Sequence, residues 1–309
     1  MHRLHYIEWG DRRNPNVVVC AHGYSGNARD FDALAQSLAP GARVVCIDFP
    51  GRGESDWLAT PLEYHFGQLL ADIGALLVHV GAGRVDWIGT SMGGLLGMLL
   101  AARPLGPVKR LVMNDVGAFV PLDALQAITH RLGAPARFAS LEAVEAHLRV
   151  THAEWGELTP KQWRHLAMHG ARREAGGWRL HYDPRIVRLL RPFPLGLGLF
   201  FWDAWYRVAC PVLLLRGQRS AVFPAEVART MLAVKPAARL VQFPGCGHVP
   251  ALMSQRQIAV VRNFVREGMD KAAWRQPRFS SFPACSRIRT PSSTRSRASS
   301  SPAPARSPT

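Results

Sequence analysis

The feature that most constrains this chain is the alternation of short β-branched runs with longer helical stretches. Six runs have the compact, nearly unbroken apolar character of strands buried on both faces: Val17–Ala21, Val44–Asp48, Val85–Gly89, Arg110–Asn114, Val212–Arg216 and Arg239–Phe243. Asp30–Leu38, Tyr64–Val80 and Gly93–Arg103 have helical periodicity. The alternation predicts an α/β fold, in which helices cover both faces of a mostly parallel sheet. Leu4–Trp9 alternates with period two and predicts an antiparallel edge strand.

The alternation is interrupted over residues 118–208, which contain amphipathic stretches but no convincing strand. Helices are predicted at Leu122–Leu132, Leu141–Thr151 and Pro160–Ala171. We therefore expect a helical cap over 118–208, inserted into a core made of residues 1–117 and 209–270. The aromatic residues of the insert either roof an apolar cavity or join the insert to the sheet; they are Trp155, Trp163, Trp178, Phe193, Phe200, Phe201, Trp202 and Trp205.

Half of the net positive charge of the chain lies in residues 271–309. The formal net charge is +16, and residues 271–309 carry 8 basic and no acidic side chains. From Gln276 onward Ser, Pro, Arg and Ala dominate without periodicity, which predicts a disordered basic tail over 271–309. A basic tail can bind polyanions, but no aromatic residue interleaves 288–309. We therefore expect no specific nucleic-acid partner.

The cysteines, the N-terminus and the apolar runs indicate where in the cell the protein is expected. The 5 cysteines are odd in number, scattered and without a CxxC pair, so they indicate neither a disulfide framework nor a zinc site. The N-terminus does not resemble an export signal, and the best apolar run, Leu95–Ala102, is too short to span a bilayer. A cytoplasmic protein without a membrane span is expected, and its oligomeric state stays open.

The strongest chemical signal is the G-x-S-x-G pattern of residues 89–93, Gly-Thr-Ser-Met-Gly. It lies between the strand predicted at Val85–Gly89 and the helix that follows. A nucleophilic serine needs such a sharp strand-to-helix turn, where side chains at the flanking glycine positions would collide with the backbone. The helix N-terminus also favours developing negative charge. These features predict that Ser91 is a nucleophile.

A serine hydroxyl needs a base within hydrogen-bond reach. His248 lies on a glycine-rich loop directly after the last predicted strand, at the same edge of the sheet as Ser91. We predict that His248 is this base. The histidines of the insert are spaced through polar helical faces and are expected at the surface; they are His130, His147, His152, His165, His169 and His181.

Acyl transfer also needs two backbone N–H donors that point at the oxyanion. Met92 follows the nucleophile, and Tyr24 follows the His22-Gly23 pair at the end of an early strand, so their amides are the two candidates. His22 is interpreted as a structural residue of its loop. Asp48 precedes the nucleophile in the sequence, which suits loop bracing better than catalysis.

Four motifs then occur in order: H-G-x-x-G at 22–26, D-x-P-G-x-G-x-S at 48–55, G-x-S-M-G-G at 89–94 and G-x-G-H at 245–248. In this respect the chain resembles the cap-bearing serine hydrolases of the α/β-hydrolase superfamily, over about residues 4–267. The resemblance implies a mostly parallel eight-stranded sheet, an inserted helical cap and a Ser-His-acid triad that uses no cofactor and no metal. It does not extend to a substrate.

The acid of the triad is where the chain departs from the pattern. In similar proteins an aspartate follows the seventh strand in a segment like R-G-x-x-S-D, and here that position is Ala221. Asp115, at the carboxyl end of the sixth strand, is the best replacement, although it can equally be a structural residue of the loop that enters the cap. Glu226 and Asp203 are weaker candidates.

The sequence leads to one hypothesis and two alternatives. The hypothesis is a serine hydrolase that cleaves a small, fairly apolar ester, lactone or related carbonyl compound through an acyl-enzyme on Ser91. A carbon–carbon bond hydrolase or a perhydrolase would use the same serine and histidine. An alternative of another class is a catalytically impaired binding protein on a hydrolase fold, motivated by Ala221 and by the basic tail.

Overall fold

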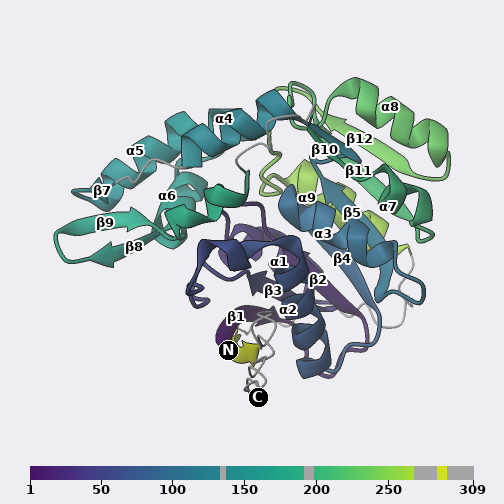
Figure 1. Ribbon diagram of the computed structural model, residues 1–309, viewed down its shortest axis with the longest axis horizontal. Helices are drawn as coiled ribbons and strands as arrows, with labels where there is room; N and C mark the ends of the chain where they lie inside the picture. The colour runs from purple at the N-terminus through teal and green to yellow at the C-terminus, as the bar shows by residue number, and fades with distance from the viewer. Residues whose placement is uncertain (133–136, 191–197, 268–283, 291–309) are drawn as a thin grey trace, which may run out of the picture.

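A twisted eight-stranded sheet forms the centre of the computed structural model, which describes residues 1–132, 137–190, 198–267 and 284–290 (Figure 1). The strand order is β12-β11-β5-β4-β2-β3-β1-β13. The strands are β1 (His2–Trp9), β2 (Val17–Ala21), β3 (Arg43–Asp48), β4 (Val85–Thr90), β5 (Val108–Asn114), β11 (Val212–Gly217), β12 (Arg239–Phe243) and β13 (Ala284–Thr290). The six strands from β12 to β3 in this order are parallel to one another. β1 pairs antiparallel with β3 on one side and with β13 on the other. The predicted α/β architecture is confirmed.

Helices cover both faces of this sheet because successive side chains of a strand point to opposite faces. Val17 and Val19 of β2 pack in one core cluster, and Val18 and Cys20 pack in the other. The first cluster contains side chains of α2 (Phe66–His79), α3 (Met92–Ala101), α7 (Trp202–Arg207) and α8 (Ala225–Val234). The second contains side chains of α1 (Asp32–Leu38) and α9 (Gln255–Arg266). Four 3-10 turns complete the described helices: η1 (Ala28–Phe31), η2 (Pro61–Tyr64), η3 (Ala153–Trp155) and η4 (Pro184–Leu190).

The register of the parallel strands brings several loops to one edge. Ala21 of β2 pairs with Gly89 of β4, and Thr90 of β4 pairs with Asn114 of β5. Asn114 in turn pairs with Leu215 of β11. The carboxyl ends of these four neighbouring strands therefore lie side by side, where open α/β sheets bind their ligands.

The insert contains the predicted helices α4 (Leu122–Leu132), α5 (Leu141–Thr151) and α6 (Pro160–Gly170), which project together from the core (Figure 1). It also contains short strands that the sequence analysis missed: β6 (Phe119–Pro121), β7 (Arg137–Phe138), β8 (Ala171–Glu174), β9 (Gly177–Leu180) and β10 (Gly198–Phe200). They form a sheet of β7, β9 and β8 and a pair of β10 with β6. Strands of two to four residues, several of them rich in arginine, lack the apolar run on which the prediction relied.

The aromatic residues of the insert have different roles. Trp205 is fully buried in the core, and its indole N–H donates to the Met231 carbonyl at 3.2 Å, so it joins the insert to the core. Trp163 packs in a separate cluster of insert residues that also includes Met253 of the core. Trp155 lines a cavity that is described below. Phe193 lies outside the described residues.

Part of the predicted tail is a strand. Residues 284–290 form β13 and pair with β1 over seven positions, from His2 with Thr290 to Glu8 with Ala284 (Figure 1). The prediction of disorder is wrong for these residues, and β1 is an inner strand instead of the predicted edge strand. The signal was the alternation of exposed Arg287 and Arg289 with buried Ile288 and Thr290, which the composition of the whole tail concealed. Residues 271–283 and 291–309 of the predicted tail lie outside the described residues.

We find no helix in the described ranges that is long and apolar enough to cross a membrane.

Candidate active site

Ser91 lies on the sharp turn between β4 and α3, with φ of 50° and ψ of −114°. The turn is tight enough to exclude side chains beside it. A Cβ on Gly89 would lie 2.2 Å from the Gly93 carbonyl carbon, and a Cβ on Gly93 would lie 2.1 Å from the Ala21 oxygen. The positive φ of Ser91 is a strained conformation for a residue with a side chain, and functional sites are where such strain is found. The geometry agrees with the reason for which the sequence analysis selected Ser91.

A chain of hydrogen bonds joins Ser91 to a histidine and a carboxylate. His248 Nε2 lies 3.1 Å from Ser91 Oγ, and His248 Nδ1 lies 2.8 Å from Asp115 Oδ2. Ser91 and His248 are partly accessible, whereas Asp115 is completely buried. The structure therefore brings together the three residues that the sequence analysis selected as catalytic candidates.

Asp115 is held in place from both sides. Its backbone has a positive φ of 58°, and its N–H donates to the Leu215 carbonyl at 2.9 Å. Its Oδ1 accepts a hydrogen bond from the Gly217 N–H at 2.7 Å, which leaves Oδ2 directed at His248. The structural contact and the contact with His248 thus use different oxygens of one carboxylate.

The other acid candidates lie elsewhere. Asp203 is exposed in the first turn of α7, and Glu226 is exposed in the first turn of α8, where it pairs with Arg229 at 3.1 Å. Ala221 is exposed on the loop after β11. Neither Asp203 nor Glu226 contacts His248 among the contacts of the described residues.

The two predicted oxyanion donors flank Ser91. Met92 is the first residue of α3, so its N–H lies before the first intrahelical hydrogen bond. The loop that carries Tyr24 runs past Ser91, since a Cβ on Gly23 would lie 3.7 Å from Ser91 Cβ. The backbone of both residues is therefore close to the serine.

Arg52 contacts both of these residues, and the sequence analysis missed it. Its Nε donates to the Tyr24 carbonyl at 2.8 Å, and its Nη2 lies 4.0 Å from Met92 Sδ. Its Nη1 donates to the Pro50 carbonyl at 2.8 Å, and its guanidinium lies over the Tyr24 and Tyr64 rings. Arg52 is fully buried, which lowers its pKa from the ordinary value. A buried charge that bonds to main-chain carbonyls fixes the loops that carry them.

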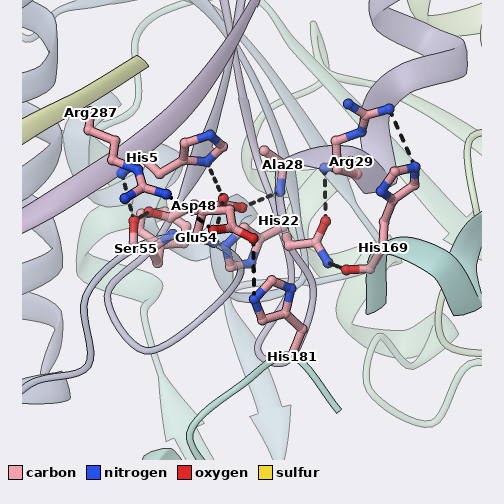
Figure 2. Close-up of polar contacts among 12 residues, drawn as sticks. His5, His22, Ala28, Arg29, Asp48, Glu54, Ser55, His169, His181 and Arg287 are labelled. Atoms are coloured by element: carbon pink, nitrogen blue, oxygen red, sulfur yellow. Dashed lines mark hydrogen bonds and ion pairs between the residues drawn. The ribbon is translucent and has the colours of Figure 1, made fainter. Parts of the chain in front are cut away.

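Asp48 and His22 brace the neighbouring loops, as the sequence analysis expected (Figure 2). Asp48 accepts hydrogen bonds from the Ala28 N–H at 2.6 Å and the Glu54 N–H at 3.1 Å, and it lies 2.5 Å from His5 Nδ1. Burial acts to raise the pKa of Asp48, but the contacts with His5, His22 and the Ala28 N–H together hold this pKa below its usual value.

His22 is neutral in this environment. Its Nε2 accepts from the Phe49 N–H at 3.0 Å, and its Nδ1 lies 2.6 Å from the Gly23 carbonyl oxygen. Complete burial lowers the pKa of His22 to about 4. The imidazole therefore acts as a neutral hydrogen-bond bridge between two loops and is not placed to act as a second base.

Ser91 lies between two cavities. We call the first the larger cavity; its wall includes Ser91, His248 and a group of insert residues that we call the roof, namely Ile128, Arg131, Leu132, His147, Leu148, Thr151 and His152. We call the second the apolar cavity; its wall includes Met92, Leu95, Val116, Val120, Leu125, Leu199 and Val222. A substrate attacked at Ser91 can therefore extend in two directions, one mixed in polarity and one apolar.

The sequence analysis expected the histidines of the insert at the surface, and this is wrong for His147, for His152 and for His181, whose side chain is 12% exposed. His147 and His152 both line the larger cavity. Burial lowers the pKa of His147, and burial assisted by the nearby charge of Arg131 lowers the pKa of His152 to about 3. Both imidazoles are thus neutral at neutral pH. The helical periodicity that predicted α5 could not show that a polar face of this helix covers a cavity.

One group in the described part of the chain has the side-chain types of a metal site: Asp32, His165 and His169. A guanidinium already lies among them, because Arg29 Nη2 is 2.6 Å from Asp32 Oδ2 and 3.4 Å from His169 Nε2. His165 Nε2 also lies 3.0 Å from the Arg29 carbonyl oxygen. The cation of this cluster is Arg29, and the cluster joins the core to α6. Figure 2 shows the contact between Arg29 and His169.

Comparison with known proteins gives concordant relatives. The sequence profile of the alpha/beta hydrolase family matches residues 18–262. A 3-hydroxybutyrate-oligomer hydrolase of Cupriavidus necator is 39% identical over 272 residues, which is 85% of this chain and 93% of that protein. The solved structure of a hydrolase from Rickettsia typhi has a TM-score of 0.82 at 28% identity, covering 86% of this chain and 92% of that one. An alpha/beta hydrolase from Novosphingobium aromaticivorans has a TM-score of 0.77 at 33% identity, with 86% and 94% covered.

Proposed function

The chain belongs to the alpha/beta hydrolase family and is a hydrolase, and from this premise we propose that it cleaves carboxylic esters through an acyl-enzyme on Ser91. The observation that carries the proposal is the hydrogen-bonded chain from Ser91 Oγ through His248 to Asp115 at the wall of the larger cavity. Three side chains in this arrangement activate a serine by general-base catalysis.

In the first half of the reaction, Ser91 Oγ attacks the ester carbonyl carbon and its proton passes to His248 Nε2. The Tyr24 and Met92 amides donate hydrogen bonds to the oxyanion. Asp115 Oδ2 accepts from His248 Nδ1–H, which fixes the tautomer and stabilises the imidazolium. When the carbon–oxygen bond breaks, His248 gives the proton to the leaving alcohol. The acyl group remains on Ser91.

In the second half, His248 takes a proton from water and the hydroxide attacks the acyl carbon. The bond to Ser91 Oγ breaks, the carboxylic acid leaves, and His248 returns the proton to Ser91. Every proton in this cycle passes through His248 Nε2, the ring nitrogen that lies 3.1 Å from Ser91 Oγ. The cycle needs no cofactor.

We propose short oligoesters of a 3-hydroxy acid as the substrate class. The relative from Cupriavidus necator, whose match covers most of both chains, supports this choice. The apolar cavity beside Ser91 is lined by Leu and Val side chains, which suits an uncharged aliphatic unit. This class refines the small, fairly apolar ester that the sequence analysis expected.

The proposal is tested by covalent labelling. A fluorophosphonate probe is expected to modify Ser91 in the full chain, with the labelled peptide located by mass spectrometry. Ser91→Ala should abolish labelling and turnover, and Ser25→Ala is the matched control because Ser25 lines the same cavity. Labelling of Ser91→Ala equal to that of the unmodified protein would refute the proposal.

A substrate panel separates the alternatives from the sequence analysis. It contains a 3-hydroxybutyrate dimer, a p-nitrophenyl ester, a vinylogous diketone, and acetate with peroxide. Preferred cleavage of the diketone would indicate a carbon–carbon bond hydrolase, and preferred peracid formation would indicate a perhydrolase. Ligand binding without turnover of any of them would favour the binding-protein alternative.

A further inference from the structure

We propose that Arg131, in the roof above Ser91, binds a free carboxylate of the substrate, so that the enzyme selects esters that carry an acid group. This inference rests on the proposed ester hydrolysis at Ser91 and names the chemical class that this site accepts. The carboxylate-bearing part of the substrate would occupy the larger cavity, and the uncharged part would occupy the apolar cavity.

The first observation is the position of Arg131. It lies in the last turn of α4 and lines the larger cavity together with Ser91 and His248. Among the described residues that line this cavity, it is the one arginine or lysine. Its guanidinium is therefore the fixed positive charge available to a molecule bound at Ser91.

The second observation is that Arg131 contacts a neutral group. Its Nη1 donates to the Thr151 carbonyl at 3.3 Å, and within the described ranges it forms no ion pair. Other arginines of the insert are paired with carboxylates: Arg149 with Glu145, Arg164 with Glu142, and Arg172 and Arg179 with Glu174. Arg131 thus keeps guanidinium donors for a ligand, whereas these arginines have internal partners.

The third observation concerns the groups around Arg131. Arg131 is an exposed residue, and burial of part of it lowers the pKa of its guanidinium, while the nearby charge of Glu154 acts to raise it. The guanidinium stays protonated. The neighbouring His147 and His152 are neutral, and the Thr151 hydroxyl donates to the His147 carbonyl at 2.9 Å. Within the roof, Arg131 is therefore the positive charge among neutral polar groups, and Glu154 is the acidic group that acts on it from outside the roof.

The acidic side chain of the same wall opposes this charge only weakly. Burial raises the pKa of Asp30 to about 7, so that a substantial fraction of this carboxyl is protonated at neutral pH. Its Oδ2 is also engaged by the Asn27 N–H at 3.1 Å. A substrate carboxylate that enters the larger cavity therefore meets Arg131 as the positive charge of the wall and competes for it with the nearby Glu154.

The ligand that matches these features is a carboxylate. A guanidinium binds it through two parallel N–H donors, which match the two oxygens of a carboxylate. A linear oligoester of a hydroxy acid ends in one free carboxylate, a short distance from its last ester bond. Arg131 would hold that end while Ser91 attacks the ester.

The experiment compares acids with their methyl esters. We measure kcat/KM of the full chain for the 3-hydroxybutyrate dimer and trimer and for the same compounds with the terminal carboxylate methylated. The unmodified enzyme should prefer the acids. Arg131→Gln should lower kcat/KM for the acids by roughly 10- to 100-fold, mainly through KM, and change the methyl esters less than threefold. Arg131→Lys should restore part of the preference.

Controls separate the possible failures. Arg149→Gln is the matched variant, because Arg149 lies on α5 with its charge paired to Glu145. If Arg131→Gln does not fold, inhibition of the unmodified enzyme by 3-hydroxybutyrate against its methyl ester gives the same comparison. Equal turnover of acids and methyl esters by an enzyme labelled at Ser91 would overturn the role of Arg131 alone. Absence of both labelling and turnover would instead refute the proposed ester hydrolysis.

Discussion

The loops at the sheet edge and the roof above them are held in different ways. In the loops at the sheet edge, the buried side chains of Arg52, Asp48 and His22 bond to main-chain groups of neighbouring loops. In the roof, Arg131 makes one long contact with a main-chain carbonyl. Contacts to the main chain fix the position of reacting groups, whereas a side chain with spare donors can bind a ligand. Substitutions in the loops at the sheet edge should therefore lower kcat for every ester, and substitutions in the roof should affect only some esters.

The largest effect should come from Asp115→Asn. An asparagine keeps the size of the side chain but cannot stabilise the imidazolium or hold the same tautomer of His248, so kcat should fall by about 10³- to 10⁴-fold. The measurement is steady-state turnover of a neutral p-nitrophenyl ester and of an acid substrate, which should fall alike. Asp203→Asn, an exposed carboxylate of α7, is the control and should keep full activity.

Ala221→Asp sharpens this test. Ala221 is exposed, and His248 Nδ1 already has a carboxylate partner at 2.8 Å, so a second acid should raise turnover little. A large gain from Ala221→Asp, together with unchanged turnover of Asp115→Asn, would mean that Asp115 is structural and that the chain lacks its catalytic acid.

A smaller effect is expected from Arg52→Gln. The glutamine loses the contacts that hold the Tyr24 carbonyl and the Met92 side chain, so the two oxyanion amides should be less well placed. Loss of one oxyanion donor costs about 10²- to 10³-fold in kcat, and imperfect placement should cost less, roughly 10- to 100-fold. We expect kcat to fall for acids and methyl esters alike with little change in KM, the opposite of Arg131→Gln. A change confined to KM would contradict a positioning role for Arg52.

The sequence could predict the features that depend on residues close together in the chain. The bounds of the six strands were predicted within two residues, because strands covered on both faces need unbroken apolar runs. The expected burial on both faces is wrong for Arg239–Phe243, which forms the partly exposed edge strand β12. Ser91 was predicted because only glycine fits beside so tight a turn, as the 2.1 Å approach at Gly93 shows. Such requirements are local, so the residues that meet them form a pattern that can be identified in the sequence.

Features that depend on segments distant in sequence could not be settled in this way. The contact of Asp115 with His248 requires β5 to lie beside both β4 and β11 and requires a positive φ at Asp115. Arg52 occupies a position that the motif at 48–55 leaves open, and the roof histidines have ordinary local sequences. Their roles follow from which loops and cavities the fold places beside them. Periodicity finds a helix face but not what the face covers.

Neutral buried imidazoles make the stability of both regions depend on pH, and His22 of the loops can be tested separately from His152 of the roof. The folded-state pKa of His22 is about 4 against 6.5 for an unperturbed histidine, so the unfolded chain binds the proton more readily. Stability from this residue is therefore complete above about pH 6.5 and is lost as the pH falls toward 4. Between pH 7 and pH 5 the loss should be about 2 kcal/mol.

Urea unfolding at pH 7 and pH 5 measures this loss. In His22→Gln the amide oxygen can still accept from the Phe49 N–H but does not titrate, so the decrease should be smaller than in the unmodified protein by about 2 kcal/mol. His130→Gln, an exposed histidine of α4, is the matched control and should leave the decrease unchanged. Equal decreases in His22→Gln and in the unmodified protein would contradict the assignment of a neutral buried imidazole.

The smallest effect is expected at β13. Arg287 pairs with Glu54 at 3.2 Å, and Glu54 lies 3.6 Å from the His181 imidazole of the insert, so polar contacts join the last strand to the insert through the loop that carries Glu54 (Figure 2). The Arg287 and Glu54 side chains are 46% and 52% exposed, and exposed ion pairs contribute about 0–1 kcal/mol. Arg287→Gln should therefore change the free energy of unfolding by less than about 1 kcal/mol and leave turnover unchanged.

Ile288→Ala is the comparison variant for Arg287→Gln. Ile288 is 7% exposed and packs in the core cluster with Leu4 and Tyr6 of β1, so its truncation should cost about 2 kcal/mol or more. If residues 284–290 pair with β1 by backbone hydrogen bonds and apolar packing, urea unfolding will separate the two variants clearly. If instead the segment were held by its charges, Arg287→Gln would be the more damaging change. Equal, negligible effects of both would mean that the segment does not dock on β1, and that β1 is the edge of the sheet after all.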